Sequence, residues 1–176
     1  STAVKDTSNN AYAGISDATT LSFTAADIVV PTLASSTPAD DATGIAVNSN
    51  IVLTFNETVQ AGTGNITLFK SDSTSVEVFD VTTDVTVSGA TVTLDPASDL
   101  DSSQGYYVQV ASTAVKDTSN NAYAGISDTT TLSFTSIDSA PPTLASSSPA
   151  DDATGIAVNS NIVLTFSETV QAGTGN

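Results

Sequence analysis

Apolar residues recur at every second position in several short segments of the chain. In the segment 50–55, Ile51, Leu53 and Phe55 fall on one face of an extended strand, opposite Val52 and Thr54. Similar segments, bounded by turn-forming residues, predict further strands at 32–37, 66–69, 76–81, 85–87, 91–94, 106–111 and 131–135. No segment shows a clear 3.6-residue apolar period. The pattern therefore predicts an all-β fold, a two-sheet sandwich of about seven to eight antiparallel strands.

The sequence contains a long internal repeat. Residues 1–65 recur as residues 112–176 at a constant offset of 111 positions, and eight of the 65 aligned pairs differ. Five of these eight differences fall at positions 25–30. A stretch that varies between copies while its flanks stay the same is most simply a linker between domains. The second copy of this stretch carries Pro141 and Pro142, which disfavour a central strand and stiffen a short connection.

A repeat unit of 111 residues has the size of one domain. With the linkers near Asp27 and Asp138, residues 28–138 form a complete copy. Residues 1–27 are then the C-terminal part of a preceding copy, and residues 139–176 the N-terminal part of a following one. We therefore expect the chain to be a segment of a longer tandem array. The incomplete copies are expected to be disordered or to pair with strands of another chain.

Composition excludes several functions. The chain has 19 acidic and three basic residues, a formal charge of −16, so no basic surface is available to neutralise the phosphates of nucleic acid. It has no His and no Cys, which removes imidazole bases, thiolate nucleophiles, disulfides and soft-metal sites. No apolar run in this segment approaches the ~18 residues of a membrane span.

Two sets of motifs resemble a known family. The segment 141–155 (PPTLASSSPADDATG), followed by 161–170 (NIVLTFSETV), is similar to the beginning of bacterial Ig-like domains. The segments 106–110 (YYVQV), 115–121 (VKDTSNN) and 131–135 (TLSFT) are similar to their closing half. The resemblance implies an Ig-like β-sandwich. It also implies tandem arrays of the kind found in S-layer proteins and large secreted or RTX-type adhesins, and therefore an extracellular or cell-surface location.

Three carboxylates are expected to converge at a domain junction. In a seven-strand sandwich, the loops that carry Glu57 and Asp117 lie at the same pole, which the linker with Asp27 also reaches. These carboxylates would repel one another unless a cation lay among them. Ca²⁺ prefers carboxylate and amide oxygens, so we predict a Ca²⁺ site that also includes Asn121. The alternative is an Asx-turn, in which Asp117 and the asparagines after it bond loop amides.

The next copy of this junction would use Asp138 and Glu168. Bound Ca²⁺ would act mechanically there, by stiffening the linker and stabilising the folded domain. At the opposite pole, Asp40 and Asp41 form the densest acidic pair, which we interpret as solvated turn carboxylates. Tyr106 is expected to bond back to the loop before it, as tyrosines at this corner of Ig-like sandwiches do.

The sequence favours a structural extender whose partners are the neighbouring repeats of the same protein. One alternative is a self-assembling filament or S-layer subunit, in which other copies of the chain complete the partial domains. Another is a module that binds glycan or protein through its loops. An enzyme is not expected, because the chain has no Trp and only four Tyr to shape a sugar-binding cleft around paired carboxylates.

Overall fold

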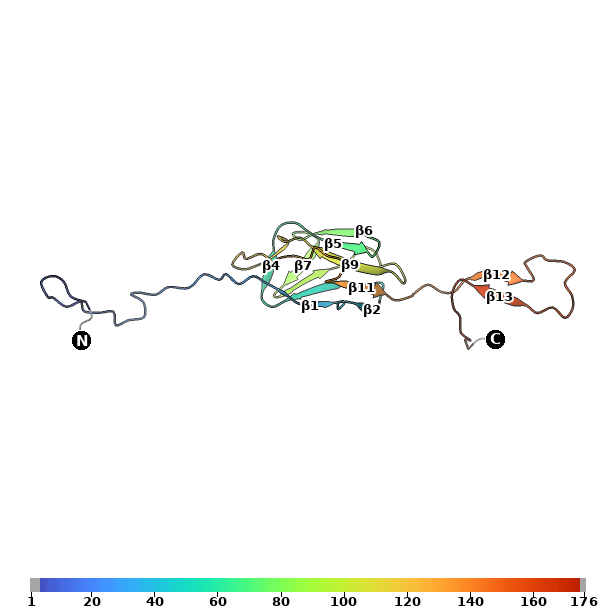
Figure 1. Cartoon of the computed structure of the whole chain (residues 1–176), viewed down its shortest axis with the longest axis horizontal. Coiled ribbons are helices and arrows are strands. Elements are labelled where there is room, and N and C mark those ends of the chain that lie inside the picture. Colours follow the sequence, from blue (N-terminus) through green and yellow to red (C-terminus); the bar gives the residue numbers. More distant parts are fainter. Residues whose placement is uncertain (1–3, 175–176) are drawn as a thin grey trace.

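The computed structural model describes residues 4–174, which form a compact body between two extended flanks (Figure 1). All the secondary-structure elements assigned within these residues are β-strands. The strands of the body are β1 (Leu33–Thr37), β2 (Ala42–Ile45), β3 (Ile51–Phe55), β4 (Val59–Ala61), β5 (Asn65–Lys70), β6 (Ser75–Asp80), β7 (Val85–Ser88), β8 (Thr91–Leu94), β9 (Gly105–Val110), β10 (Val115–Asp117) and β11 (Ser133–Ser136). The C-terminal flank adds β12 (Leu144–Ser148) and β13 (Val163–Phe166). The described residues include no helix of the length and apolarity that a membrane crossing requires.

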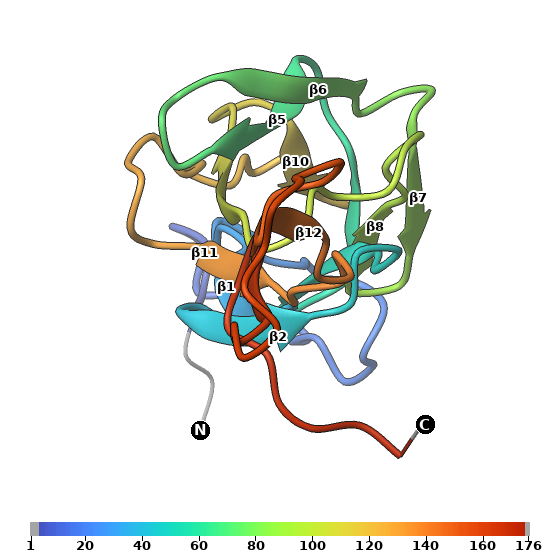
Figure 2. The same ribbon diagram turned by 90° about the vertical axis from the view of Figure 1, so that its right-hand side faces the viewer.

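Two sheets form the body. One has the strand order β1-β3-β8-β7 and the other β2-β11-β9-β5-β6, while β10 and β4 make a separate short pair. The pairings are antiparallel except that of β2 with β11, which is parallel. Figure 2 shows β1 and β2 on one side of the body and β5 and β6 on the opposite side. The all-β sandwich that the sequence predicts is confirmed.

The core consists of the inward faces of both sheets. Ile51, Leu53 and Phe55 of β3 are buried, and the residues between them are half-buried, as the alternation predicts. In the other sheet, Tyr106 and Val108 of β9 face the same core. Burial of each such large apolar side chain contributes about 1.5–3 kcal/mol relative to leaving it in water. The buried apolar side chains of the two sheets together are sufficient to explain a folded domain that has no disulfide.

Three short strands differ from the sequence expectation. β2 lies where a turn was predicted, and β4 and β10 lie within predicted loops. Each is only three or four residues long and has no clear apolar alternation in its sequence. They form because β2 pairs with β11 and β4 pairs with β10, partners that are distant in sequence. These tertiary pairings also explain why the body has more strands than predicted and one parallel pair.

The loop between β8 and β9, residues 95–104, closes one end of the body. The Asp101 amide donates a hydrogen bond to the Tyr106 hydroxyl at 2.7 Å, which confirms the role predicted for this tyrosine. Lys70 forms an ion pair with Asp101 at 2.6 Å, and the Leu100 amide donates to the Val47 carbonyl at 2.7 Å. Three separate segments therefore hold this loop in place.

The flanks repeat sequences of the body in a different environment. β12 pairs with β13 in the register of β1 with β3, so that Leu144 lies opposite Phe166. The body buries Phe134 to 2% exposure, whereas its repeat counterpart Phe23 is 90% exposed. In the flanks, β12 and β13 therefore pair as strands although no second sheet of the described residues faces them, but their apolar side chains are not buried in a core. The domain boundaries at residues 27/28 and 138/139 stay a prediction.

Candidate metal centre

Three carboxylates meet where the N-terminal linker, residues 25–31, reaches the body. Asp27 belongs to this linker, Glu57 lies between β3 and β4, and Asp117 is the last residue of β10. One carboxylate oxygen of each lies within 4.8 Å of the other two. The structure thus brings together three of the residues that the sequence analysis selected. Asp117 was expected in a loop, but it is its strand pairing opposite Val59 that places it near Glu57.

Asp117 is the most rigidly held of the three side chains. It is 1% exposed, and its Oδ1 accepts hydrogen bonds from the amides of Ser119 at 2.8 Å and Asn121 at 2.7 Å. Its Oδ2 accepts a bond from the Asn121 side-chain amide at 2.7 Å. Burial acts to raise the pKa of Asp117, but the bonds from Asn121, Ser119 and Asn120 outweigh it and hold that pKa below its usual range. Asp117 is therefore a fixed anion.

The turn around Asp117 is a local structure that forms in both copies. In the N-terminal flank, Asp6 accepts the amides of Ser8 and Asn10 and the side-chain amide of Asn10, at 2.8–2.9 Å. This copy forms although its surroundings are exposed. The Asx-turn interpretation is therefore correct for the local geometry. It accounts for the backbone amides around Asp117, but it does not account for the approach of Asp27 and Glu57.

Glu57 is in a less favourable electrostatic environment. Its Oε1 is buried and has no hydrogen-bond partner within residues 4–174. Burial, followed by the charges of Asp117 and Asp27, raises the pKa of the Glu57 carboxyl. An orphaned carboxylate oxygen that faces two other carboxylates is destabilising unless a proton or a cation neutralises it.

Asp27 approaches from the exposed side of the site. Its Oδ2 lies 3.5 Å from the Ser119 hydroxyl, and its backbone carbonyl accepts a bond from the Asn121 side-chain amide at 3.1 Å. The Asn121 side-chain amide thus donates to both aspartates and helps to position them, and its role as a Ca²⁺ ligand stays a prediction. Beyond Asp27, the Thr32 amide donates to Asn56 Oδ1 at 2.7 Å, which fixes the end of the linker on the body.

The second predicted pair lies at the C-terminal linker: Asp138 belongs to this linker, and Glu168 follows β13. Hydrogen bonds from Ser102 and then from the Ala140 amide hold the pKa of Asp138 below its usual range, against the opposing effect of burial. A cation site that joins Asp138 and Glu168 stays a prediction. At the repeat offset of 111, the 176 residues contain no counterpart of Asp117 for this pair.

Sequence reasoning missed the short polar residues that hold the linkers. Asn56 binds the Thr32 amide, and Ser167, its repeat counterpart, binds the Thr143 amide at 2.9 Å in the same way. The available signal was that both residues of this differing pair are short side chains with an oxygen acceptor. Ser102 gave no comparable signal, because its counterpart does not lie within the repeated segments.

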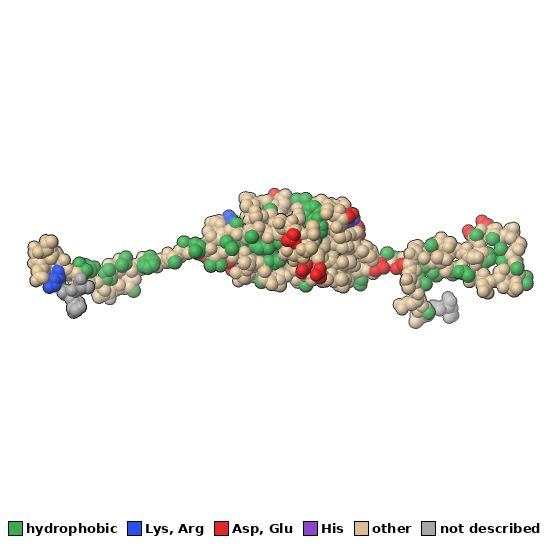
Figure 3. Space-filling model, in the orientation of Figure 1, with side chains coloured by type: hydrophobic (Ala, Val, Ile, Leu, Met, Phe, Trp, Pro, Cys, Tyr) green, Lys and Arg blue, Asp and Glu red, His purple; other side chains and the backbone are tan. Residues whose placement is uncertain are grey.

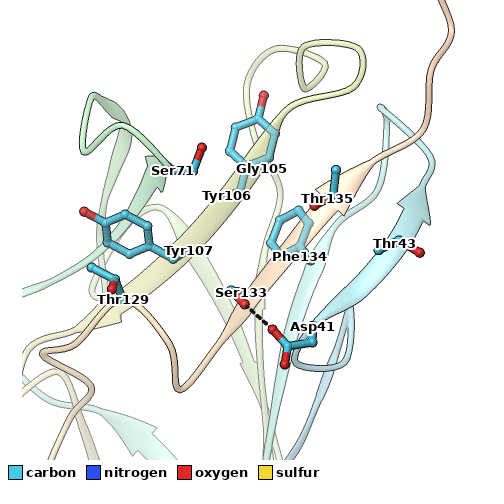
Figure 4. Close-up of a pocket in the computed structure, with 10 residues that line it drawn as sticks. All are labelled: Asp41, Thr43, Ser71, Gly105, Tyr106, Tyr107, Thr129, Ser133, Phe134 and Thr135. Atoms are coloured by element: carbon cyan, nitrogen blue, oxygen red, sulfur yellow. Dashed lines mark hydrogen bonds between the residues drawn. The ribbon is translucent and has the colours of Figure 1, made fainter.

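The acidic pair at the opposite pole takes part in the fold. The Ser133 amide donates to Asp40 Oδ1 at 2.9 Å, and the Ser133 hydroxyl donates to Asp41 Oδ1 at 3.0 Å. Asp41 also borders a shallow hollow of about 400 Å³ between β2, β9 and β11 (Figure 4). Tyr107 lines this hollow, but it is 6% exposed and stacks on Phe69 with ring centroids 5.0 Å apart. Its ring is therefore not free to stack on a sugar.

Comparison with known families assigns the chain. The model of a family described as bacterial Ig-like domain matches residues 27–136 and again residues 138–176. The chain belongs to the bacterial Ig-like domain family. The first match to this Ig-like model ends at residue 136 and the second begins at residue 138. Both limits fall within the short region where the two copies of the internal repeat differ most. No curated protein matches the chain.

Solved structures of similar fold include CopC from Methylosinus trichosporium OB3b, with 14% identity and a TM-score of 0.46 over 63% of this chain and 97% of that one. The N-terminal part of the bacterial S-layer protein SbsC has 22% identity and a TM-score of 0.43, over 66% of this chain and 26% of that one. The structure rSbsC(31-844) has 20% identity and a TM-score of 0.42, over 68% and 16%. These likenesses concern the fold of the Ig-like domain alone.

Proposed function

We propose that the chain is a spacer module of a bacterial cell-surface or secreted protein, in which Ca²⁺ at the junctions fixes each linker to the domain that follows it. Membership of the bacterial Ig-like family supports the non-enzymatic, extracellular part of this proposal. The shape supports the spacer role, because the two flanks leave the body at opposite ends (Figure 1). A chain that enters one end of a domain and leaves the other extends the array with every repeat.

The observation that carries the cation proposal is the buried, unpartnered oxygen of Glu57, which lies in a group of three carboxylates. Ca²⁺ binds six to eight oxygens in flexible geometry, so three carboxylates leave room for backbone oxygens and water. The soft ligands that favour zinc or copper are absent, because the chain has no His, Cys or Met.

The mechanical effect would follow from the origin of the three ligands. Asp27 belongs to the linker, whereas Glu57 and Asp117 belong to the body. A cation that binds all three would hold the linker against the body and oppose separation of the two. Because the unfolded chain does not hold the three together, binding would also stabilise the folded body by mass action, by about 2.7 kcal/mol at a hundredfold excess over Kd.

Thermal unfolding of the chain in millimolar Ca²⁺ and in chelator tests this proposal. The expected result is a higher melting temperature in Ca²⁺, which Glu57→Gln removes. Asp99→Asn is the matched control, since Asp99 is an exposed acid of the β8–β9 loop, distant in the fold from the site. Identical melting curves with and without Ca²⁺ would refute the cation proposal, and an unchanged Ca²⁺ response in Glu57→Gln would refute this location.

Assembly with other copies of the chain is the second candidate function. Large apolar side chains whose repeat counterparts are buried lie exposed in the flanks, including Phe23 and Leu164. In an array they would be covered by the rest of their own domain; in a filament they would be covered by another chain. Light scattering separates the two. A monomer over a wide concentration range supports the spacer, and defined oligomers support assembly.

A further inference from the structure

The C-terminal linker, residues 136–142, begins as part of the body. The Ser136 amide donates to the Gln104 carbonyl at 3.0 Å, and the Ser103 amide donates to the Ile137 carbonyl at 3.1 Å. The Ile137 amide in turn donates to the Ile45 carbonyl at 2.7 Å. Ser136, the last residue of β11, and Ile137 therefore attach the start of the linker to the β8–β9 loop and to the end of β2.

Ser102 extends this attachment to the next three residues. Its hydroxyl donates to Asp138 Oδ1 at 2.9 Å and accepts the amides of Ser139 at 2.7 Å and Ala140 at 3.2 Å. The Ala140 amide also donates to Asp138 Oδ1, at 3.1 Å. A serine hydroxyl has one donor and two acceptor positions, so Ser102 uses its full capacity on the linker. Acidic side chains gather on the surface where the body meets this linker, as Figure 3 shows.

The segment beyond Ala140 has little freedom left. The Thr143 amide donates to the Ser167 hydroxyl, and the Ser167 amide donates to the Thr143 carbonyl, both at 2.9 Å. Only Pro141 and Pro142 lie between the two held segments, and proline fixes its own φ near −65°. The connection between the body and the β12–β13 hairpin therefore contains two residues without a hydrogen-bonded anchor, and both are conformationally restricted.

The contacts of Ser136 and Ser139 described above are made by their backbone amides, and the N-terminal linker carries different side chains at these two positions. Ala25 stands where Ser136 stands in the C-terminal linker, and Ile28 stands where Ser139 stands. Asp27, in contrast, matches Asp138. The five differing positions thus lie on both sides of this aspartate, which is the same in the two linkers.

We propose that Ser102 is a positioning residue that locks the C-terminal linker to the body without a cation. Each linker is then held by two unlike devices. A neutral hydroxyl clamp attaches it to the domain before it, and the carboxylate site attaches it to the domain after it. Removal of cations would free each linker only from the domain after it. Bending between two domains would therefore start after residue 140 or its equivalent. The clamp itself stands independently of the proposed Ca²⁺ site.

Amide hydrogen exchange of the full chain, measured by NMR, tests the clamp. We expect the Ser139 and Ala140 amides to be protected equally in Ca²⁺ and in chelator. Ser102→Ala should lower the protection of the Ser139 amide about tenfold, the effect of losing a hydrogen bond that limits local opening, and leave the core amide of Val108 unchanged. The Ala140 amide should lose less protection, because it also donates to Asp138 Oδ1. Ser98→Ala, in the same loop, is the matched control, and Ser102→Thr should restore protection because it retains the hydroxyl.

Two results would overturn the proposal. Protection of the Ser139 amide that survives Ser102→Ala would show that the hydroxyl does not hold the linker. Protection that is absent in the unaltered chain, or that arises only with Ca²⁺, would show that the attachment is not independent of cations. The proposed Ca²⁺ site is judged separately, because the shift of melting temperature with Ca²⁺ should persist in Ser102→Ala.

Discussion

At the scale of single residues, Glu57 is the side chain whose environment fits its charge least well. Burial and two neighbouring aspartates raise the pKa of its carboxyl. Without cations, the folded chain therefore binds more protons at this group than the unfolded chain does, over the pH range between the ordinary pKa and the raised one. Under the linkage relation, the free energy of unfolding falls as the pH rises through that range and stays lower above it.

Glu57→Gln should therefore stabilise the chain in chelator at neutral pH. Its neutral amide has no charge to repel Asp27 and Asp117 and offers N–H groups to their oxygens. The gain should shrink as the pH falls through the raised pKa of Glu57, where the unaltered side chain becomes neutral too. In saturating Ca²⁺ the order should reverse. Melting temperatures of both proteins from about pH 4, near the ordinary pKa of glutamate, up to about pH 8 measure this. A variant less stable in chelator at neutral pH contradicts the account.

At the scale of elements, the turn after β10 separates what local sequence determines from what tertiary structure adds. The turn around Asp6 and the turn around Asp117 have the same hydrogen bonds, and Lys5 and Lys116 each donate to the asparagine four residues on. Only the copy at Asp117 is buried and paired, through β10, with β4. The same turn should therefore contribute more to the free energy of unfolding at Asp117 than at Asp6.

Asp117→Asn should lower the melting temperature clearly, whereas Asp6→Asn should leave it nearly unchanged. In the first variant, an amide group replaces an anion that accepts three hydrogen bonds, and one N–H group would face the N–H of Asn121. In the second, the exposed turn contributes nothing to the core. Circular dichroism melts of the pair in chelator provide the measurement. Equal effects in the two variants would mean that the body does not depend on its own copy of the turn.

The sequence predicted the long elements well and the short ones poorly. The alternation in β3 and β9 is strong enough to identify the strands and their buried faces, and the strands predicted at 85–87 and 91–94 form the hairpin of β7 and β8. β4 and β10 exist only because they pair with each other, so no local pattern could reveal them. The convergence of Asp27, Glu57 and Asp117 was predicted from sandwich topology, whereas the hydroxyl contacts of Ser102 depend on loop geometry that topology does not specify.

At the scale of the whole molecule, the same sequence lies in a core at one position and in solvent at another. Leu53 is 0% exposed within the body, and its repeat counterpart Leu164 is 52% exposed in β13. The difference arises because the body supplies a second sheet and the described part of the C-terminal flank supplies only a hairpin. Cooperative unfolding of the chain should therefore report on the body alone.

Leu53→Ala should lower the free energy of unfolding by about 2–5 kcal/mol, the range for a leucine deleted from a packed core. Leu164→Ala should change it by less than about 0.5 kcal/mol, as surface substitutions usually do. Denaturant titrations of the two variants make the comparison. A cost of similar size in both would mean that the C-terminal flank has a core of its own or shares one with another chain.

The central functional claim is that a cation joins a linker to the domain after it. The most direct measurement is isothermal titration calorimetry of Ca²⁺ into the chelator-treated chain, with Asp27→Asn and Asp99→Asn as the paired variants. The three carboxylates predict a single tight site per chain, which Asp27→Asn weakens strongly and Asp99→Asn preserves. Titration without heat of binding, or binding that Asp27→Asn leaves unchanged, would contradict the account.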